Sequence, residues 1–121
     1  MIYAILAYHP EGVIQAMTPE EGGALMDSLL KVHDRINEQS SLGPAARLDF
    51  TRSAVTLRAG EVIDGPFAET KEQLLGFYAV ECDTLEAAVD AARQLQRVNT
   101  TAVYEIRPVT LYLPGELVGG A

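Results

Sequence analysis

The N-terminal run Ile2–His9 constrains the fold most, because it is apolar on both of its alternating faces. In a strand one face would carry Ile2, Ala4, Leu6 and Tyr8, and the other Tyr3, Ile5 and Ala7. Pro10-Glu11-Gly12 ends the run after so few residues that a strand is favoured over a helix. A strand with two apolar faces needs a covering layer on each side. The chain must therefore supply or recruit two such layers.

Two segments predict helices. Thr18-Pro19-Glu20-Glu21 is typical of a helix start, because Thr18 can cap, Pro19 fits the first turn and Glu21 can complete a capping box. This helix is expected to run to about Gln39. Its wide apolar stripe consists of Leu25, Leu29, Val32 and Ile36, flanked by Met26 and Leu30. Asp83-Thr84-Leu85-Glu86 repeats the pattern and predicts a second helix that ends near Arg97.

Between the helices the pattern changes to short strands. Ser40–Pro44 is expected to stop the first helix and turn the chain. Ala46–Arg58 then alternates polar and apolar positions, which indicates two short strands or one bent strand. Ala59-Gly60 predicts a tight turn into Glu61–Asp64, so that a small hairpin forms in the middle of the chain.

The remaining segments complete the plan. Glu69–Leu74 can form one turn of helix at most, whereas Gly76–Cys82 and Thr101–Val109 predict strands. The order predicts an α+β protein of ferredoxin-like βαββαβ topology, with an antiparallel sheet and an extra central hairpin. We expect one domain over residues 1–114 and a loose tail over residues 115–121.

Composition narrows the function classes. A chain of 121 residues with 48% hydrophobic residues can build one core, and 17 acidic against 9 basic residues give a formal charge of −8. Scattered Lys and Arg argue against nucleic acid and against an anionic membrane surface. No signal peptide or transmembrane segment is recognisable, and one cysteine cannot form an internal disulfide. A cytoplasmic protein is expected.

In a ferredoxin-like fold both helices cover the same face of the sheet. The opposite face is predicted to be apolar as well, because both faces of Ile2–His9 are apolar and Gly76–Cys82 is rich in aromatic and β-branched residues. Apolar patches of this size usually mark an interface. We therefore predict a homodimer in which two sheets pack face to face.

The segment Asp64–Tyr78, DGPFAETKEQLLGFY, closely resembles the signature of the DGPF-domain branch of the YciI-like, or YCII-related, family. Leu42–Leu48 and Tyr104–Val109 are similar to the flanking motifs of that branch. The resemblance implies a bacterial, cytoplasmic dimer of the dimeric α/β-barrel type, frequently encoded beside extracytoplasmic-function sigma factors. It implies no defined biochemical activity.

The wider YciI-like pattern includes a His in the first helix and an Asp after the second, proposed as an acid–base pair. Alignment by eye places Leu29 at the position of that His and Leu95 or Gln96 at the position of the Asp. The family's proposed chemistry therefore does not carry over to this chain.

The signature segment itself offers candidate site residues. Asp64, Glu69 and Lys71 could face a pocket at the barrel mouth, where a carboxylate beside an ammonium binds or deprotonates a small substrate; Asp64 and Glu69 are the candidate catalytic groups. The alternative is structural. Gly65-Pro66 would then fix a turn around Asp64, and Phe67 would fill the core.

Three further residues are candidate ligand contacts. Arg47 could clamp a carboxylate or phosphate through its planar guanidinium, or could form an ordinary ion pair with Asp49. Tyr8 and His9 end the first strand, a common ligand position, although a lone His there is more often an ordinary loop residue.

Other polar residues have plainer interpretations. His33 is expected at the boundary of the helix stripe, Cys82 as a buried, inert thiol, and Glu105 with Arg107 as cross-strand ion-pairing residues. The spacing of His and acidic residues matches no metal motif, and no nucleotide-binding or hydrolase motif occurs, so no metal and no cofactor are predicted.

The function predicted from these observations is the binding of a small anionic or aromatic ligand between the helix-free sheet faces of a dimer or at their edge. The alternative is a cofactor-free enzyme of the same fold, performing acid–base or oxygenase chemistry on a small carbonyl or phenolic substrate with Asp64 or Glu69 as base and Arg47 as anion anchor. A third interpretation is a regulatory partner of a sigma factor.

Overall fold

A computed structural model describes residues 1–116, so residues 117–121 of the predicted tail lie outside the described residues. The elements in chain order are β1 (Ile2–His9), α1 (Glu11–Gln15), α2 (Pro19–Gln39), β2 (Ser41–Arg47), the 3-10 turn η1 (Thr51–Ser53), β3 (Val55–Arg58), β4 (Glu61–Asp64), β5 (Gln73–Glu81), α3 (Leu85–Val98) and β6 (Val103–Pro108).

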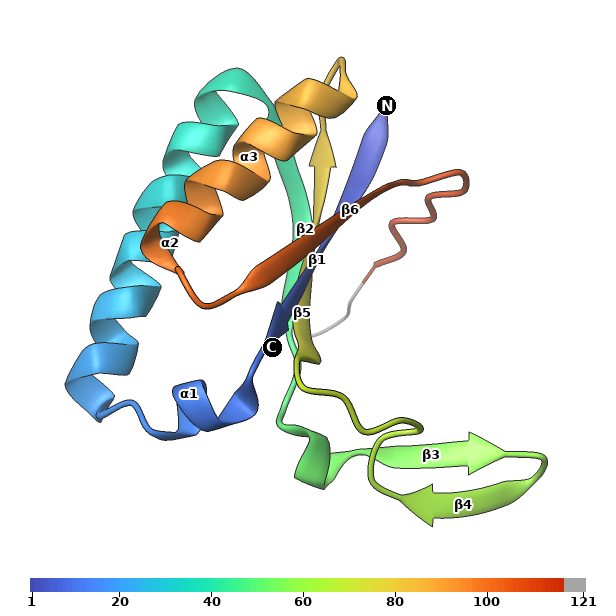
Figure 1. Ribbon diagram of the computed structural model, residues 1–121. Coiled ribbons are helices and arrows are strands. Elements are labelled where there is room, and N and C mark those ends of the chain that lie inside the picture. Colours follow the sequence, from blue (N-terminus) through green and yellow to red (C-terminus); the bar gives the residue numbers. More distant parts are fainter. Residues whose placement is uncertain (117–121) are drawn as a thin grey trace.

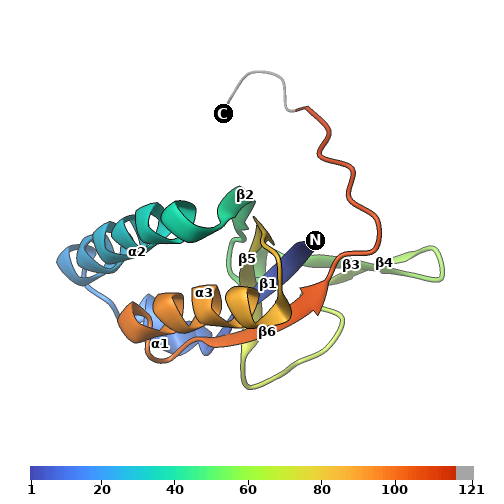
Figure 2. The ribbon, with the colours of Figure 1, turned by 90° about the horizontal axis from the view of Figure 1, so that it is seen from above.

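Four of the strands form one antiparallel sheet in the order β2-β5-β1-β6. Helices α2 and α3 lie on the same face of this sheet (Figures 1 and 2). The predicted α+β ferredoxin-like fold is therefore confirmed. Strands β3 and β4 pair only with each other and form a separate hairpin.

The core lies between the helices and the covered face of the sheet. Alternation along β1 points Tyr3 and Ile5 toward the helices, with Val80 of β5 opposite Tyr3. Val32 and Ile36 of α2 meet this layer and are fully or almost fully buried. α3 completes the core with one fully buried leucine and three buried alanines, Leu95, Ala88, Ala91 and Ala92.

Both helix starts follow their sequence signatures. The Glu21 N–H donates to Thr18 Oγ1 over 3.1 Å, and the Thr18 N–H donates to the Glu21 carboxylate over 3.0 Å, which completes the capping box. The pKa of Glu21 is lowered because these hydrogen bonds favour its ionised form. Thr84 accepts a hydrogen bond from the Ala87 N–H at the start of α3.

One strand begins earlier than expected. Ser40–Pro44 does not merely turn the chain, because β2 already starts at Ser41 and ends at Arg47. Pro44 has no N–H to donate, but β2 is an edge strand, and its register shifts between Leu42 and Ala45. An edge strand with a register shift can contain Pro44, although in the sequence this proline indicated a turn.

Strand β5 also starts earlier than expected, at Gln73 rather than at Gly76. The segment 69–74 contains no helix, which agrees with the expectation of one helical turn at most. The register against β1 skips Leu75, and this bulge lets Leu74 and Gln73 continue the pairing. The short helix α1 was not anticipated, because its five residues are too few to show a helical period.

The second face of the sheet carries no helix in the described part of the chain (Figure 1). Cross-strand neighbours on it include the apolar pairs Leu6 with Phe77 and Ala4 with Ala79, whereas β6 adds Glu105 and Arg107 to the same face, so the face is apolar only in part. The sheet is open, and residues 1–116 of one chain close no barrel. The homodimer and the dimeric barrel stay predictions.

No helix within residues 1–116 is long and apolar enough to span a membrane.

Candidate functional site

A cavity of about 570 Å³ lies between α2 and the covered face of the sheet. It forms because the two halves of α2 behave differently: Val32 and Ile36 are its only buried residues, and both lie in the C-terminal half. The N-terminal half has no buried residue and borders the cavity instead. The volume is within the range of small-molecule sites.

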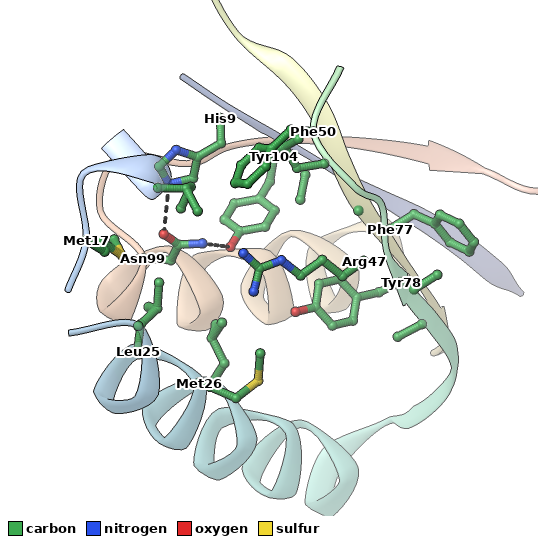
Figure 3. A pocket seen from close by; sticks show the side chains of 18 of the residues that line it. His9, Met17, Leu25, Met26, Arg47, Phe50, Phe77, Tyr78, Asn99 and Tyr104 are labelled. Carbon is green, nitrogen blue, oxygen red and sulfur yellow. Dashed lines mark hydrogen bonds between the residues drawn. The ribbon is translucent and has the colours of Figure 1, made fainter. Parts of the chain in front are cut away.

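Apolar side chains make up most of the wall. Leu25 and Met26 of α2 face the sheet across the cavity, and Met17 precedes the helix (Figure 3). Leu29 of α2 also lines the cavity. Further apolar lining comes from Ile14 of α1, Phe50 and Leu75. Such a wall favours a ligand with an apolar body, because the apolar surface of that body is removed from water on binding.

Arg47 is the one charged side chain, apart from the histidines, among the described residues that line the cavity. It ends β2, lies opposite Gly76 of β5 and points into the cavity (Figure 3). The expected ion pair with Asp49 is wrong. No carboxylate of residues 1–116 lies within 4 Å of the guanidinium, because Asp49 instead accepts hydrogen bonds from Phe50 N–H and Ser53 Oγ at η1. These bonds lower the pKa of Asp49.

The close approach of the strands at this point depends on Gly76. A Cβ atom on Gly76 would lie 2.8 Å from the Ala46 carbonyl oxygen of β2, which no side chain tolerates. The glycine of the signature segment therefore has a steric role: it lets β2 approach β5 closely enough to place Arg47 beside the cavity.

Tyr78 and His33 form a polar pair on the cavity wall. His33 Nε2 lies 3.2 Å from the Tyr78 hydroxyl, and the rings meet edge to face with centroids 5.2 Å apart. Burial raises the pKa of Tyr78 to about 12. Burial is also the main cause of the lowered pKa of His33. At neutral pH the pair is therefore a neutral phenol and a neutral imidazole.

A second polar group comes from β1, β6 and the end of α3. His9 is only 4% exposed, and its Nε2 lies 3.1 Å from Asn99 Oδ1 and 2.9 Å from Thr101 Oγ1. Asn99 Nδ2 in turn donates to the Tyr104 hydroxyl over 3.3 Å (Figure 3). Since that oxygen already accepts a hydrogen bond, the Tyr104 O–H is free to donate to a ligand. Burial raises the pKa of Tyr104, which keeps this donor protonated.

Two groups of the cavity can donate hydrogen bonds to a ligand. These are Arg47 and the Tyr104 hydroxyl, and no Asp or Glu occurs among the described lining residues. A carboxylate ligand would therefore meet donors without meeting a like charge. The arrangement suits a ligand with an apolar body and one anionic head.

The predicted site residues separate into two groups. Arg47 and His9 line the cavity, although the His9 ring nitrogens are engaged with neighbouring residues. Tyr8 lies on the opposite face of the sheet, where its hydroxyl donates to Glu105 over 3.1 Å. Asp64, Glu69 and Lys71 are exposed on the hairpin and the connection that follows it, and the structure brings none of them to the cavity. Their roles as ligand contacts or catalytic groups stay predictions.

Two structural expectations meet different outcomes. Phe67 is not a core plug, because 78% of it is exposed. Cys82 is buried as expected, and its thiol donates to the Thr84 carbonyl oxygen over 3.4 Å; burial raises its pKa.

The pairing of Glu105 and Arg107 differs from the expectation. It occurs within β6 rather than across strands, with Arg107 Nε 3.9 Å from Glu105 Oε2. Within residues 1–116 no group of three or more His, Cys, Asp or Glu side chains could hold a metal ion.

Sequence reasoning missed three residues of the cavity. Asn99 and Tyr104 come from the end of α3 and from β6, and no local motif joins them to His9. His33 was assigned to the boundary of an apolar stripe, and its partner Tyr78 is 45 residues away in sequence. The one sequence feature that could have indicated the cavity is the apolar stripe of α2, which is wider than the stripe of a helix that packs on one surface.

Fold and cavity define a class: a ferredoxin-like α+β protein with an apolar, donor-lined cavity between its first long helix and its sheet. The family model of the YCII-related domain matches residues 1–112. The chain is also 52% identical, over 97% of its length and 98% of the relative's, to an uncharacterised protein of Rhizobium meliloti (strain 1021). The chain belongs to the YCII-related family.

Proposed function

We propose that this protein binds a small carboxylate with an apolar or aromatic body in the cavity between α2 and the sheet. The observation that carries the proposal is Arg47, a guanidinium directed into an apolar cavity and without a carboxylate partner among residues 1–116. The predicted ligand class is kept, but its place changes: the cavity is on the helix-covered face, not on the helix-free face.

The head and the body of the ligand would have separate partners. The carboxylate would accept hydrogen bonds from Arg47 and from the Tyr104 hydroxyl, whose position Asn99 fixes. The body would lie against Leu25, Met26 and Leu29. Because Arg47 is itself exposed, the head would lie at the solvent edge of the cavity and the body further in.

A matched pair of probes tests this proposal. Isothermal titration calorimetry would compare 2-naphthoate with 2-naphthamide, which share the apolar body and differ in charge. We expect the wild type to prefer the carboxylate by about tenfold or more, and Arg47→Gln to abolish that preference. Arg35→Gln is the control, since Arg35 is an exposed arginine of α2 that does not line the cavity.

Two outcomes would contradict the proposal. One is equal affinity of the wild type for both probes, and the other is no binding of either probe. A cavity-filling variant, Leu25→Trp, locates the site, because it should block both probes while the folded state is kept. Binding that survives this change would place the ligand elsewhere.

A second candidate function is proton transfer, and the pair of His33 and Tyr78 favours it. A neutral imidazole 3.2 Å from a phenol inside a cavity can act as a general base, since its lowered pKa keeps it unprotonated. The test is the exchange of the benzylic hydrogens of phenylpyruvate in D₂O, followed by NMR. We expect the wild type to accelerate exchange and His33→Gln to remove the acceleration. Unchanged exchange in the variant would leave ligand binding as the function.

A further inference from the structure

His9 is buried in the wall of the cavity, and the ligand contacts proposed above do not use it. Its Nδ1 lies 3.2 Å from the Pro10 carbonyl oxygen. Its Nε2 lies 3.1 Å from Asn99 Oδ1 and 2.9 Å from Thr101 Oγ1. An oxygen that can accept a hydrogen bond therefore lies beside each ring nitrogen.

These oxygens decide how many hydrogens the His9 ring can use. A backbone carbonyl oxygen and the oxygen of a carboxamide only accept hydrogen bonds. The contact with Pro10 therefore needs a hydrogen on Nδ1, and the contact with Asn99 Oδ1 needs one on Nε2. A neutral imidazole carries one of these hydrogens and an imidazolium carries both. The arrangement in Figure 3 therefore fits the charged form of His9.

A neutral His9 satisfies the same neighbours only when the Asn99 amide is turned over. With its hydrogen on Nδ1, the ring accepts at Nε2, and Asn99 can donate to Nε2 only through Nδ2. Half a turn of the amide then brings Oδ1 to the Tyr104 hydroxyl, which donates to Oδ1 and no longer to the cavity. The other neutral tautomer leaves the Nδ1 lone pair against the Pro10 oxygen. The proton on His9 thus selects whether Tyr104 offers the cavity a hydrogen or a lone pair.

The charges around His9 favour the same link. No carboxylate of residues 1–116 lies within 4 Å of its ring nitrogens, because the carboxylate of Glu11 accepts hydrogen bonds from Thr51 instead. The partner of His9 on β5 is the uncharged Gln73. Two phenols, a guanidinium and a second imidazole line the same cavity: Tyr78 of β5, Tyr104 of β6, Arg47 of β2 and His33 of α2. A positive His9 therefore has no negative neighbour until an anion enters the cavity.

We propose that the cavity takes up its carboxylate ligand together with a proton from solvent, and that His9 holds this proton. Protonated His9 donates to Asn99 Oδ1, Asn99 Nδ2 donates to the Tyr104 oxygen, and the Tyr104 O–H donates to the carboxylate. The chain of hydrogen bonds begins at a cation and ends on an anion. His9 is a positioning residue, because it acts on the ligand through Asn99 and Tyr104. The inference rests on the proposed function, since it needs a carboxylate in this cavity.

Coupling of this kind fixes the sign of the pH dependence of binding. The carboxylate favours the protonated form of His9, so linkage requires its affinity to rise as the pH falls, by at most about tenfold per pH unit. Arg47 alone gives no such dependence, because a guanidinium stays protonated at every relevant pH. The pH profile therefore separates the proposed chain of hydrogen bonds from a simple ion pair.

Isothermal titration calorimetry of 2-naphthoate in PIPES and in Tris buffer counts the protons. Each proton that the complex takes up adds the ionisation enthalpy of the buffer to the measured heat. Between about pH 6 and 8 we expect the wild type to take up a fraction of a proton per ligand, up to about one, and to bind more weakly as the pH rises. The probe itself is ionised throughout this range and takes up no proton.

Three variants assign the proton. In His9→Gln the new amide can donate to Asn99 Oδ1 but binds no proton, so 2-naphthoate should still bind, without proton uptake and without pH dependence. Tyr104→Phe interrupts the chain of hydrogen bonds, so it should weaken binding about tenfold and remove most of the uptake. His33→Gln is the matched change at the second imidazole of the cavity, and proton uptake should persist in it.

Three results would overturn the coupling: binding of 2-naphthoate that depends on neither pH nor buffer, uptake that survives in His9→Gln, or uptake that is lost in His33→Gln instead. In each of these cases the carboxylate still binds, so the proposed function stands. If neither 2-naphthoate nor 2-naphthamide binds, the proposed function and the coupling fail together. The wild type and Tyr104→Phe decide the matter if His9→Gln does not fold.

Discussion

The two halves of α2 carry one continuous apolar stripe but meet different surroundings. In the C-terminal half, Val32 and Ile36 are almost completely buried and belong to one core cluster with residues of β1, β5 and α3. In the N-terminal half, Leu25 and Met26 line a cavity of about 570 Å³. The same residue types thus stabilise the fold at one end of the helix and form a binding wall at the other.

This difference teaches that an apolar stripe reports contact with something apolar, not contact with the core. A residue in the packed half loses van der Waals partners and leaves a cavity when it is shortened. A residue in the N-terminal half of α2, the hollow half, already borders the cavity. Shortening its side chain therefore only enlarges a cavity that is already present. Stability and ligand affinity should therefore depend on different halves of α2.

The largest expected effect comes from comparing one residue of each half. Ile36→Ala should lower the free energy of unfolding by about 3 kcal/mol, because Ile36 is only 2% exposed. Leu25→Ala should lower it by about 1 kcal/mol or less. Urea titrations of the two variants measure both values, and equal losses would show that the two halves are equally packed.

A smaller effect is expected from the cap at the start of α2. The hollow half lacks buried residues, so its stability relies on local interactions such as the capping box of Thr18 and Glu21. Thr18→Ala should cost about 1 kcal/mol in urea unfolding. Thr110→Ala, at an exposed position outside both helices, is the matched control, and a similar loss in both variants would argue against the cap.

The smallest effect is the pH dependence that His33 contributes. Its pKa in the folded state is lowered below the ordinary value of 6.5, chiefly by burial. The unfolded chain therefore binds the proton more readily, and stability is retained above about pH 6.5 and declines as the pH falls below it. Partial exposure keeps the change small.

Urea midpoints at several pH values between about 7.5 and 5.5 measure this decline. His33→Gln should flatten it relative to the wild type. An unchanged slope in the variant would assign the pH dependence to another group.

The sequence by itself determined the order of elements and the caps. Alternation in β1, the two Thr-initiated helices and the Ala59-Gly60 turn act through neighbouring residues, and these were predicted from local chemistry. Local rules failed where distant strands imposed a register, as in β2 with Pro44 and in β5 with its bulge at Leu75. They also missed α1, which is too short to show a period.

Only the tertiary structure decided the candidate site. Arg47 and His9 were recognisable as candidates, but Asn99, Tyr104 and Tyr78 join them only because four strands and the end of α3 converge. The signature segment Asp64–Tyr78 divides between an exposed hairpin end and a cavity wall, which no local pattern distinguishes. The physical reason is that a cavity is a property of the space between elements, whereas a sequence pattern describes each element alone.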